Sequence, residues 1–275
     1  MHLEGFAEKA ALKRRDVSSV NLFNGNCLDV MRDSIASGSI DLVVTSPPYD
    51  DMREYQGYSF DFKPIADQLK RVIKPGGVIV WVVNDATVDG SETGSSFKQA
   101  LYFKDIGLNL HDTMIYQKIP VPHDPDSNRY WQGFEYMFIL SKGKPKTCNY
   151  IKIPCVGAGN RKATDYGTRR TDGTKRLDRY DDNRIVQDTK VKDNIWFYDI
   201  GSHHRVDGHP AQYQLQLASD HIQSWSNEGD LVLDPFMGSG TTGLASQTLK
   251  RRFVGIEISK EYFDLCDRRI RLGMT

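Results

Sequence analysis

A strand, a glycine-rich turn, a helix and a second strand follow one another near the C-terminal end of the 275-residue chain. The apolar run Leu231–Asp234 leads into Gly238, Gly240 and Gly243, which satisfy G-x-G-x-x-G, and Glu257 closes the next apolar run. At such a turn the backbone approaches a ligand closely, the helix N-terminus offers free N–H groups, and the carboxylate can accept ribose hydroxyls. The module predicts a site for an adenosine-containing ligand.

The position of this module restricts the rest of the fold. Only residues 258–275 follow Glu257, so a sheet built around the module must take its other strands from the N-terminal part, in a circularly permuted order. This order disfavours an ordinary nicotinamide-dependent oxidoreductase, although that class is kept as an alternative. A P-loop is excluded because no Gly-Lys-Thr/Ser follows the glycines.

Strand and helix patterns alternate through the remainder of the chain. Hydrophobic periodicity predicts strands over residues 20–23, 40–45, 78–83, 114–117, 136–140, 231–234 and 253–258, and helices over residues 28–35, 62–73, 211–225, 241–249 and 260–271. Trp81 is expected in the core and Trp196 in the sheet. This alternation predicts an α/β fold with a mostly parallel sheet and helices on both faces.

The charge is distributed unevenly along the chain. Lys and Arg together number 36, as do Asp and Glu. From Lys142 to Lys192, however, 14 basic residues face six Asp, a net charge of +8, in a stretch with little apolar periodicity. We interpret this stretch as an irregular basic insertion that contacts an anionic polymer, with a solvated loop as the alternative.

The predicted strand over residues 40–45 ends in Thr45-Ser46-Pro47-Pro48-Tyr49. Two prolines remove two N–H donors and stiffen the chain at the carboxyl end of a strand, where α/β proteins bind their ligands. Ser46 brings a hydroxyl, Pro47 a rigidly directed carbonyl, and Tyr49 an aromatic face on which a planar base can stack. This combination suits an exocyclic amine on a nucleobase.

Both segments resemble motifs of the S-adenosylmethionine-dependent DNA amino-methyltransferases. Ser46-Pro47-Pro48-Tyr49 resembles their catalytic tetrapeptide, and Asp234 to Thr242 resembles the loop beside the methionine part of the cofactor. The catalytic motif comes first and the cofactor loop last, which is the order of the circularly permuted β group. The resemblance implies a Rossmann-like, seven-stranded, mostly parallel sheet. It divides the chain into a catalytic half (1–141), a target-recognition insertion (142–193) and a cofactor-binding half (194–275).

The resemblance also implies roles for individual residues. Ser46, Pro47, Pro48 and Tyr49 are the candidate catalytic set. The candidate cofactor-binding set is Asn26, Cys27, Asp234, Pro235, Phe236, Gly238, Ser239, Gly240, Thr241, Thr242 and Glu257. The candidate DNA-binding set is Arg129, Arg161, Lys162, Arg169, Arg170, Lys175 and Arg176, and for Arg129 a surface salt bridge is an equal alternative.

Two of these positions depart from the family pattern. Asn26 stands where the family commonly has Asp beside the adenine, although its side-chain oxygen can still accept from the adenine amine. His209 to Tyr213 is similar to the segment that leads the helix beside the methionine moiety, but Gln214 stands where the family usually has Pro. Trp131 to Lys142 resembles the segment beside the target-base pocket.

The resemblance implies transfer of a methyl group from S-adenosylmethionine to the N4 amine of a flipped-out cytosine, leaving S-adenosylhomocysteine and requiring no metal. Ser at the start of the motif favours cytosine N4, whereas Asp or Asn usually accompanies adenine N6, which stays the alternative. Double-stranded DNA is the expected partner, and a cognate restriction endonuclease is a second. An inactive nucleotide- or DNA-binding module, an RNA substrate and a protein-glutamine substrate are further alternatives.

Other chemistries have little support in the sequence. Carbon-5 methylation needs a cysteine nucleophile, and the one Pro-Cys pair, Pro154-Cys155, lies in the basic insertion without a Glu-Asn-Val segment. His203, His204 and His209 lack further ligands for a metal, and the four cysteines lack C-x-x-C spacing, so we expect free thiols. The N-terminus shows no secretion signal and no apolar run reaches membrane length, so we expect a cytoplasmic, nucleoid-associated protein.

Overall fold

The computed structural model describes residues 19–48, 60–121, 128–155, 172, 174, 187–199 and 214–272. The chain divides into two compact units, one formed by Met1–Asn149 with Asn194–Thr275 and the other by Tyr150–Asp193.

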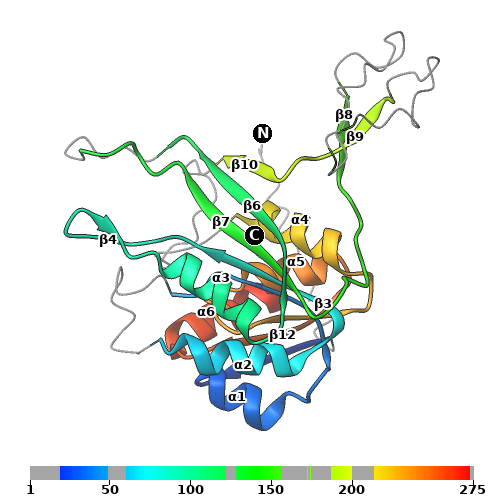
Figure 1. Ribbon diagram of the computed structural model, residues 1–275. Coiled ribbons are helices and arrows are strands. Elements are labelled where there is room, and N and C mark those ends of the chain that lie inside the picture. Colours follow the sequence, from blue (N-terminus) through cyan, green and yellow to red (C-terminus); the bar gives the residue numbers. More distant parts are fainter. Residues whose placement is uncertain are drawn as a thin grey trace, which may run out of the picture. The chain divides into compact units, whose positions relative to one another are not determined.

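The larger unit is built around an eight-stranded sheet with the order β1-β12-β11-β2-β3-β7-β6-β10 (Figure 1). Every neighbouring pair is parallel except the two that involve β7, which runs antiparallel to β3 and β6. The strands are β1 (Val20–Asn24), β2 (Ile40–Thr45), β3 (Ile73–Val83), β6 (Asn109–Ile119), β7 (Phe134–Ser141), β10 (Ile195–Asp199), β11 (Leu231–Asp234) and β12 (Arg252–Glu257).

Among the described residues, three helices cover each face of this sheet. Helices α1 (Cys27–Ser34), α2 (Phe62–Val72) and α3 (Ser95–Asp105) contact one another in sequence, and their buried residues form one apolar core with the sheet. Helices α4 (Leu215–Trp225), α5 (Thr241–Thr248) and α6 (Lys260–Leu272) form the second layer. Trp81 is fully buried in the first core, as its sequence context predicts.

The predicted α/β fold with a mostly parallel, circularly permuted sheet is confirmed. The C-terminal strands β11 and β12 lie between the N-terminal strands β1 and β2. The sheet has eight strands where seven were expected, because β10 pairs with the outer side of β6. Trp196 lies in this added strand, buried as a sheet residue.

Helix α3, a short hairpin and strand β10 were not among the predicted elements of the larger unit. Helix α3 buries Ala100 and Phe103 but exposes Phe97 and Leu101, so its apolar residues do not form the single stripe that marks an amphipathic helix. A short hairpin of β4 (Thr87–Val88) and β5 (Ser91–Glu92) follows β3, and none of its four residues is buried. Without burial there is no hydrophobic periodicity to read.

The smaller unit contains an antiparallel pair, β8 (Lys152–Pro154) and β9 (Thr189–Val191). The pairing continues on both sides, since Lys192 N donates to Ile151 O at 2.8 Å and Cys155 N donates to Asp188 O at 2.8 Å. Of the basic residues proposed to bind DNA here, Arg161, Lys162, Arg169, Arg170, Lys175 and Arg176 lie outside the described residues.

The four cysteines are free thiols, as their spacing predicts; they are Cys27, Cys148, Cys155 and Cys266.

Among the helices described, none is both long enough and apolar enough to cross a membrane.

Candidate active site

The sheet reverses its winding between β11 and β2. These strands are parallel neighbours, yet the helix that follows β11 is α5, in the second layer, whereas the helix that follows β2 is α2, in the first. When the connections from adjacent parallel strands leave toward opposite faces, they leave a crevice at the carboxyl ends of the strands. The glycine-rich turn and the Ser46-Pro47-Pro48 segment both start at this crevice.

A buried carboxylate joins the two segments. Asp234, at the end of β11, accepts hydrogen bonds from Thr45 Oγ1 to Oδ1 at 2.7 Å and from Thr242 Oγ1 to Oδ2 at 2.7 Å. The backbone N–H of Phe236 also donates to Asp234 Oδ1, at 3.1 Å. Asp234 therefore joins the end of β2, the turn and the start of α5.

The turn itself requires glycine at two positions. Gly238 and Gly240 have φ values of 49° and 85°, in the left-handed region that other residues rarely adopt. Gly240 also caps the N-terminus of α5, and a Cβ there would lie 2.5 Å from Cys266 Sγ on α6. The glycines thus serve backbone conformation and close packing together, and they place the N–H groups of the α5 N-terminus at the crevice.

A buried arginine that the sequence analysis did not single out donates a hydrogen bond to the backbone of the turn. Arg269 of α6 is buried, and its Nη1 donates to the carbonyl oxygen of Ser239 at 2.6 Å. Burial lowers the pKa of this guanidinium, which still stays protonated at any pH the protein meets. The available signal was an arginine three residues after Cys266 and beside Ile270 on the buried stripe of α6.

Glu257, at the end of β12, faces the same turn. Its Oε2 accepts from Gly238 N at 2.9 Å and its Oε1 from Ser259 N at 2.9 Å. Burial raises the pKa of this carboxyl, and the two backbone hydrogen bonds oppose that rise. Each oxygen keeps a second lone pair, so the carboxylate can accept from a ligand hydroxyl as predicted from its position.

The loop after β1 joins this end of the sheet. Gly25 N donates to the carbonyl oxygen of Glu257 at 3.0 Å. Asn26 caps α1 by accepting from Leu28 N at 2.8 Å, so the oxygen that we expected to face adenine already stabilises a helix. Cys27 is buried, and burial raises the pKa of its thiol to about 12, which makes it a neutral packing residue.

The predicted catalytic segment is only partly described. Ser46 is half-buried, Pro47 is buried and Pro48 is half-buried directly after β2, whereas Tyr49 lies outside the described residues. The structure thus brings Ser46, Pro47 and Pro48 to the same crevice as the glycine-rich turn. Among the other candidates for the cofactor, Pro235, Ser239, Thr241 and Thr242 are buried in or beside the turn, and Phe236 packs its ring 5.7 Å from that of Phe60.

Arg129 takes part in an ion pair. Its Nη2 lies 3.2 Å from Glu92 Oε1 on β5, and its Nη1 donates to Thr87 Oγ1 and Gly90 O, both at 3.4 Å. In the sequence analysis, such a surface salt bridge is the alternative to DNA binding by Arg129.

The family model described as DNA methylase, of the N6/N4 methyltransferase type, matches residues 40–268, which include both segments of the crevice. The chain belongs to the N6/N4 DNA methylase family. Within it, this DNA methylase is 51% identical over 247 residues to the orphan methyltransferase M.BamHII of Bacillus amyloliquefaciens, covering 88% of this chain and 92% of the relative. It is 29% identical over 258 residues to the type II methyltransferase M.BglII of Bacillus subtilis, covering 89% and 67%.

Solved structures share the fold of this DNA methylase. The PvuII DNA methyltransferase, described as cytosine-N4-specific, superposes with a TM-score of 0.66 at 19% identity, covering 91% of this chain and 88% of that one. The M1.HpyAVI–SAM complex superposes with a TM-score of 0.59 at 23% identity, covering 91% and 99%.

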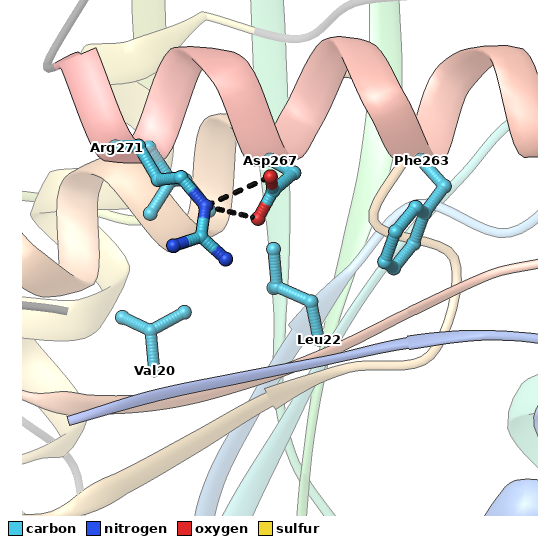
Figure 2. Close-up of a pocket in the computed structure, with 6 residues that line it drawn as sticks. Val20, Leu22, Phe263, Asp267 and Arg271 are labelled. Atoms are coloured by element: carbon cyan, nitrogen blue, oxygen red, sulfur yellow. Dashed lines mark hydrogen bonds and ion pairs between the residues drawn. The ribbon is translucent and has the colours of Figure 1, made fainter. Parts of the chain in front are cut away.

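A separate hollow of about 210 Å³ lies between β1 and α6. Figure 2 shows Asp267 and Arg271 paired along α6 on one side of this hollow, with Arg271 Nε 2.8 Å from Asp267 Oδ1. It is lined by Val20, Leu22, Phe263, Asp267, Ile270 and Arg271, none of which belongs to the candidate site.

In the parts of the chain that are described, no three His, Cys, Asp or Glu side chains gather as metal ligands, and His203, His204 and His209 lie outside those parts.

Proposed function

We propose that this DNA amino-methyltransferase transfers a methyl group from S-adenosylmethionine to the N4 amine of a cytosine that has left the double helix. The observation that carries the proposal is the 2.7 Å hydrogen bond between Thr45 and Asp234. It joins the residue just before Ser46 to the strand that leads into the glycine-rich turn. We infer that the proposed donor-binding loop and the candidate catalytic segment face one crevice.

The residues at the crevice fit the proposed cofactor. The left-handed backbone at Gly238 and Gly240 lets a ligand approach the turn and the α5 N-terminus, and the Glu257 carboxylate suits the two hydroxyls of a ribose. When bound, S-adenosylmethionine supplies an electrophilic methyl group on a sulfonium. The proposed binding residues are the turn from Asp234 to Thr242, Glu257, and the backbone of Asn26 and Cys27 beside the adenine.

Ser46 and Pro47 would prepare the amine for attack. An exocyclic amine is a poor nucleophile because its lone pair is delocalised into the ring. If its N–H groups donate to the Ser46 hydroxyl and the Pro47 carbonyl, the nitrogen becomes more tetrahedral and its lone pair points toward the methyl group. Tyr49 would stack on the base, and Pro47 and Pro48 would keep water from the nitrogen. No covalent intermediate on the enzyme is needed.

The choice of cytosine over adenine rests on Ser46. The family resemblance associates Ser at this position with cytosine N4 and Asp or Asn with adenine N6. The similar fold of a methyltransferase described as cytosine-N4-specific is consistent with this choice but speaks for the fold alone.

The proposed macromolecular partner is double-stranded DNA. We propose residues 142–193 as the target-recognition region, in which the net charge of +8 would draw the DNA backbone to the enzyme. Residues 1–141 and 194–275 would supply the catalytic and cofactor-binding halves. A cognate restriction endonuclease stays a prediction.

The test is to incubate the protein with S-adenosylmethionine and DNA of mixed sequence, digest the DNA to nucleosides and identify the product by mass spectrometry. N4-methylcytosine is expected. N6-methyladenine would overturn the base assignment and keep the reaction class. Cofactor binding without any methylated nucleoside would favour an inactive DNA-binding module, and tighter binding of a reduced nicotinamide would favour the oxidoreductase.

A further inference from the structure

The chain leaves the larger unit after Asn149 and returns to it at Asn194. Between these residues lies Tyr150–Asp193, which forms the smaller unit and makes up most of the region proposed to recognise the DNA target. Figure 1 shows β8 and β9 running side by side, and the hydrogen bond from Lys192 N to Ile151 O extends their pairing toward both asparagines. Each strand of this ladder is therefore followed, two residues beyond that bond, by an asparagine of the larger unit.

Asn149 is bound to the C-terminal end of α4. Its backbone N–H donates to Ser224 O at 2.8 Å. Its side-chain Nδ2 donates to Gln223 O and Ser226 O, both at 3.1 Å, and to Asn227 Oδ1 at 3.2 Å. Because the last carbonyl groups of a helix have no partner within the helix, this one residue supplies donors to several of them.

The end of α4 is itself held by other bonds. Arg251 is buried, and its guanidinium donates from Nη2 to Ser226 O at 2.6 Å and from Nε to Ser226 Oγ at 3.0 Å. Asn227 Nδ2 donates to Thr147 Oγ1, two residues before Asn149, at 3.1 Å. The point to which Asn149 is attached is therefore fixed within the larger unit.

Asn194 makes the corresponding attachment on β6. Its carbonyl oxygen accepts from Ile115 N at 2.9 Å. Its Nδ2 donates to Thr113 O at 3.2 Å and to Asp112 Oδ1 at 3.3 Å. Strand β10 begins at the next residue, so the chain passes directly from this attachment into the eight-stranded sheet. Both chain crossings are thus fixed by hydrogen bonds within the larger unit.

Neither asparagine contributes to a hydrophobic core. Asn149 and Asn194 are both exposed, and substitutions of exposed side chains usually change folding stability little. Each side-chain amide donates to oxygen atoms of the larger unit, a role that an apolar side chain of similar size cannot fill. What these amides hold in place is the two ends of the smaller unit.

We propose that Asn149 and Asn194 are positioning residues that restrict how the target-recognition region can move, so that it reads bases at low entropic cost. The inference rests on the proposed function, which assigns DNA recognition to that region. If the amide groups are removed, the loosened region must be ordered each time it binds its site, and ordering costs free energy.

This role predicts a difference between two kinds of DNA binding. Base readout requires side chains held at hydrogen-bond distance from base edges, whereas the attraction between basic residues and phosphates tolerates many orientations. Loss of the two amides should therefore weaken binding to the specific site and leave binding to other DNA unchanged.

The test compares two duplexes, one carrying the site that the wild-type enzyme methylates and one in which that site is scrambled. Binding is measured by fluorescence anisotropy with S-adenosylhomocysteine at saturation. The double variant Asn149→Ala/Asn194→Ala should bind the site duplex about tenfold more weakly than wild type, because ordering a loosened segment costs on that scale. Its affinity for the scrambled duplex and for the cofactor should equal that of wild type.

Asn109→Ala is the matched control. Asn109 is an exposed asparagine on β6 whose Nδ2 donates to Gly143 O at 3.1 Å, away from both crossings, so its loss should leave both duplex affinities unchanged. Where the double variant no longer binds the cofactor, the two single variants provide the same comparison.

Three results would overturn the proposal. They are wild-type affinity of the double variant for the site duplex, an equal loss on both duplexes, and loss of cofactor affinity in the single variants as well, which would show that the asparagines support the whole larger unit. A wild-type enzyme that methylates no DNA would instead refute the proposed function.

Discussion

Replacing Asp234 by Asn tests whether one buried carboxylate holds the active site together. The side chain keeps its shape, but Thr45 and Phe236 then meet a neutral oxygen, and Thr242 meets an NH2 group that cannot accept its hydrogen bond. A hydrogen bond to an ionised group contributes about 1 kcal/mol more than one to a neutral group, so three bonds predict a loss of about 3 kcal/mol in the free energy of unfolding. The same change loosens the turn, so affinity for S-adenosylmethionine should also fall.

The assay combines chemical denaturation without cofactor and isothermal titration with S-adenosylmethionine. Asp220→Asn is the matched control, because Asp220 is another buried carboxylate that accepts from Tyr198 at 2.8 Å and Gln216 at 2.6 Å, in α4. It should lower stability by about 2 kcal/mol through its two bonds and leave cofactor affinity unchanged. The reasoning is refuted if Asp234→Asn is destabilised but binds the cofactor as tightly as wild type.

Four further predictions concern the proposed ligands. Tyr49→Ala should abolish methyl transfer but retain cofactor affinity, because the ring is proposed to touch the base; an equal loss of affinity in a titration would contradict this. Glu257→Ala should weaken cofactor binding by about 1–3 kcal/mol through lost hydrogen bonds to a charged group, and an unchanged dissociation constant would rule out the ribose role. Burial raises the pKa of Glu257 above its ordinary value of 4.5, so its carboxylate forms later than usual as pH rises. Cofactor affinity should then increase as the pH rises through that pKa, and Glu257→Gln should flatten the titration. Reversing the charge of four basic residues should reduce DNA affinity and its dependence on salt in binding isotherms, whereas an intact salt slope would place the DNA elsewhere; the four are Arg169, Arg170, Lys175 and Arg176.

Pattern alone predicted the parts of the fold that are buried regularly. The run Leu231–Asp234 and the turn after it are strand and glycine loop as expected, because a buried parallel strand is a short apolar run and a left-handed backbone needs glycine. Strand β10 was missed, since Ile195 to Tyr198 are all large and apolar although only Trp196 and Tyr198 are buried. The residue types alone do not show which of the four side chains face the core.

The contacts that hold the site were less predictable than its location. The sequence did not predict that Asp234 accepts a hydrogen bond from Thr45, which lies 189 residues away in the sequence; its role toward the cofactor stays a prediction. The sequence around Arg269 predicts an exposed charge on a helix, yet Arg269 is buried and donates to the carbonyl oxygen of Ser239. Such pairings depend on which elements become neighbours in the sheet, and one sequence does not encode them locally.

The most direct test of the shared crevice is a crystal structure of the protein with S-adenosylhomocysteine. The ligand should lie between the turn after β11 and the Ser46-Pro47-Pro48 segment, with its ribose on Glu257 and its sulfur facing Ser46. A ligand bound in the hollow between β1 and α6, or on the turn but turned away from Ser46, would contradict the central claim.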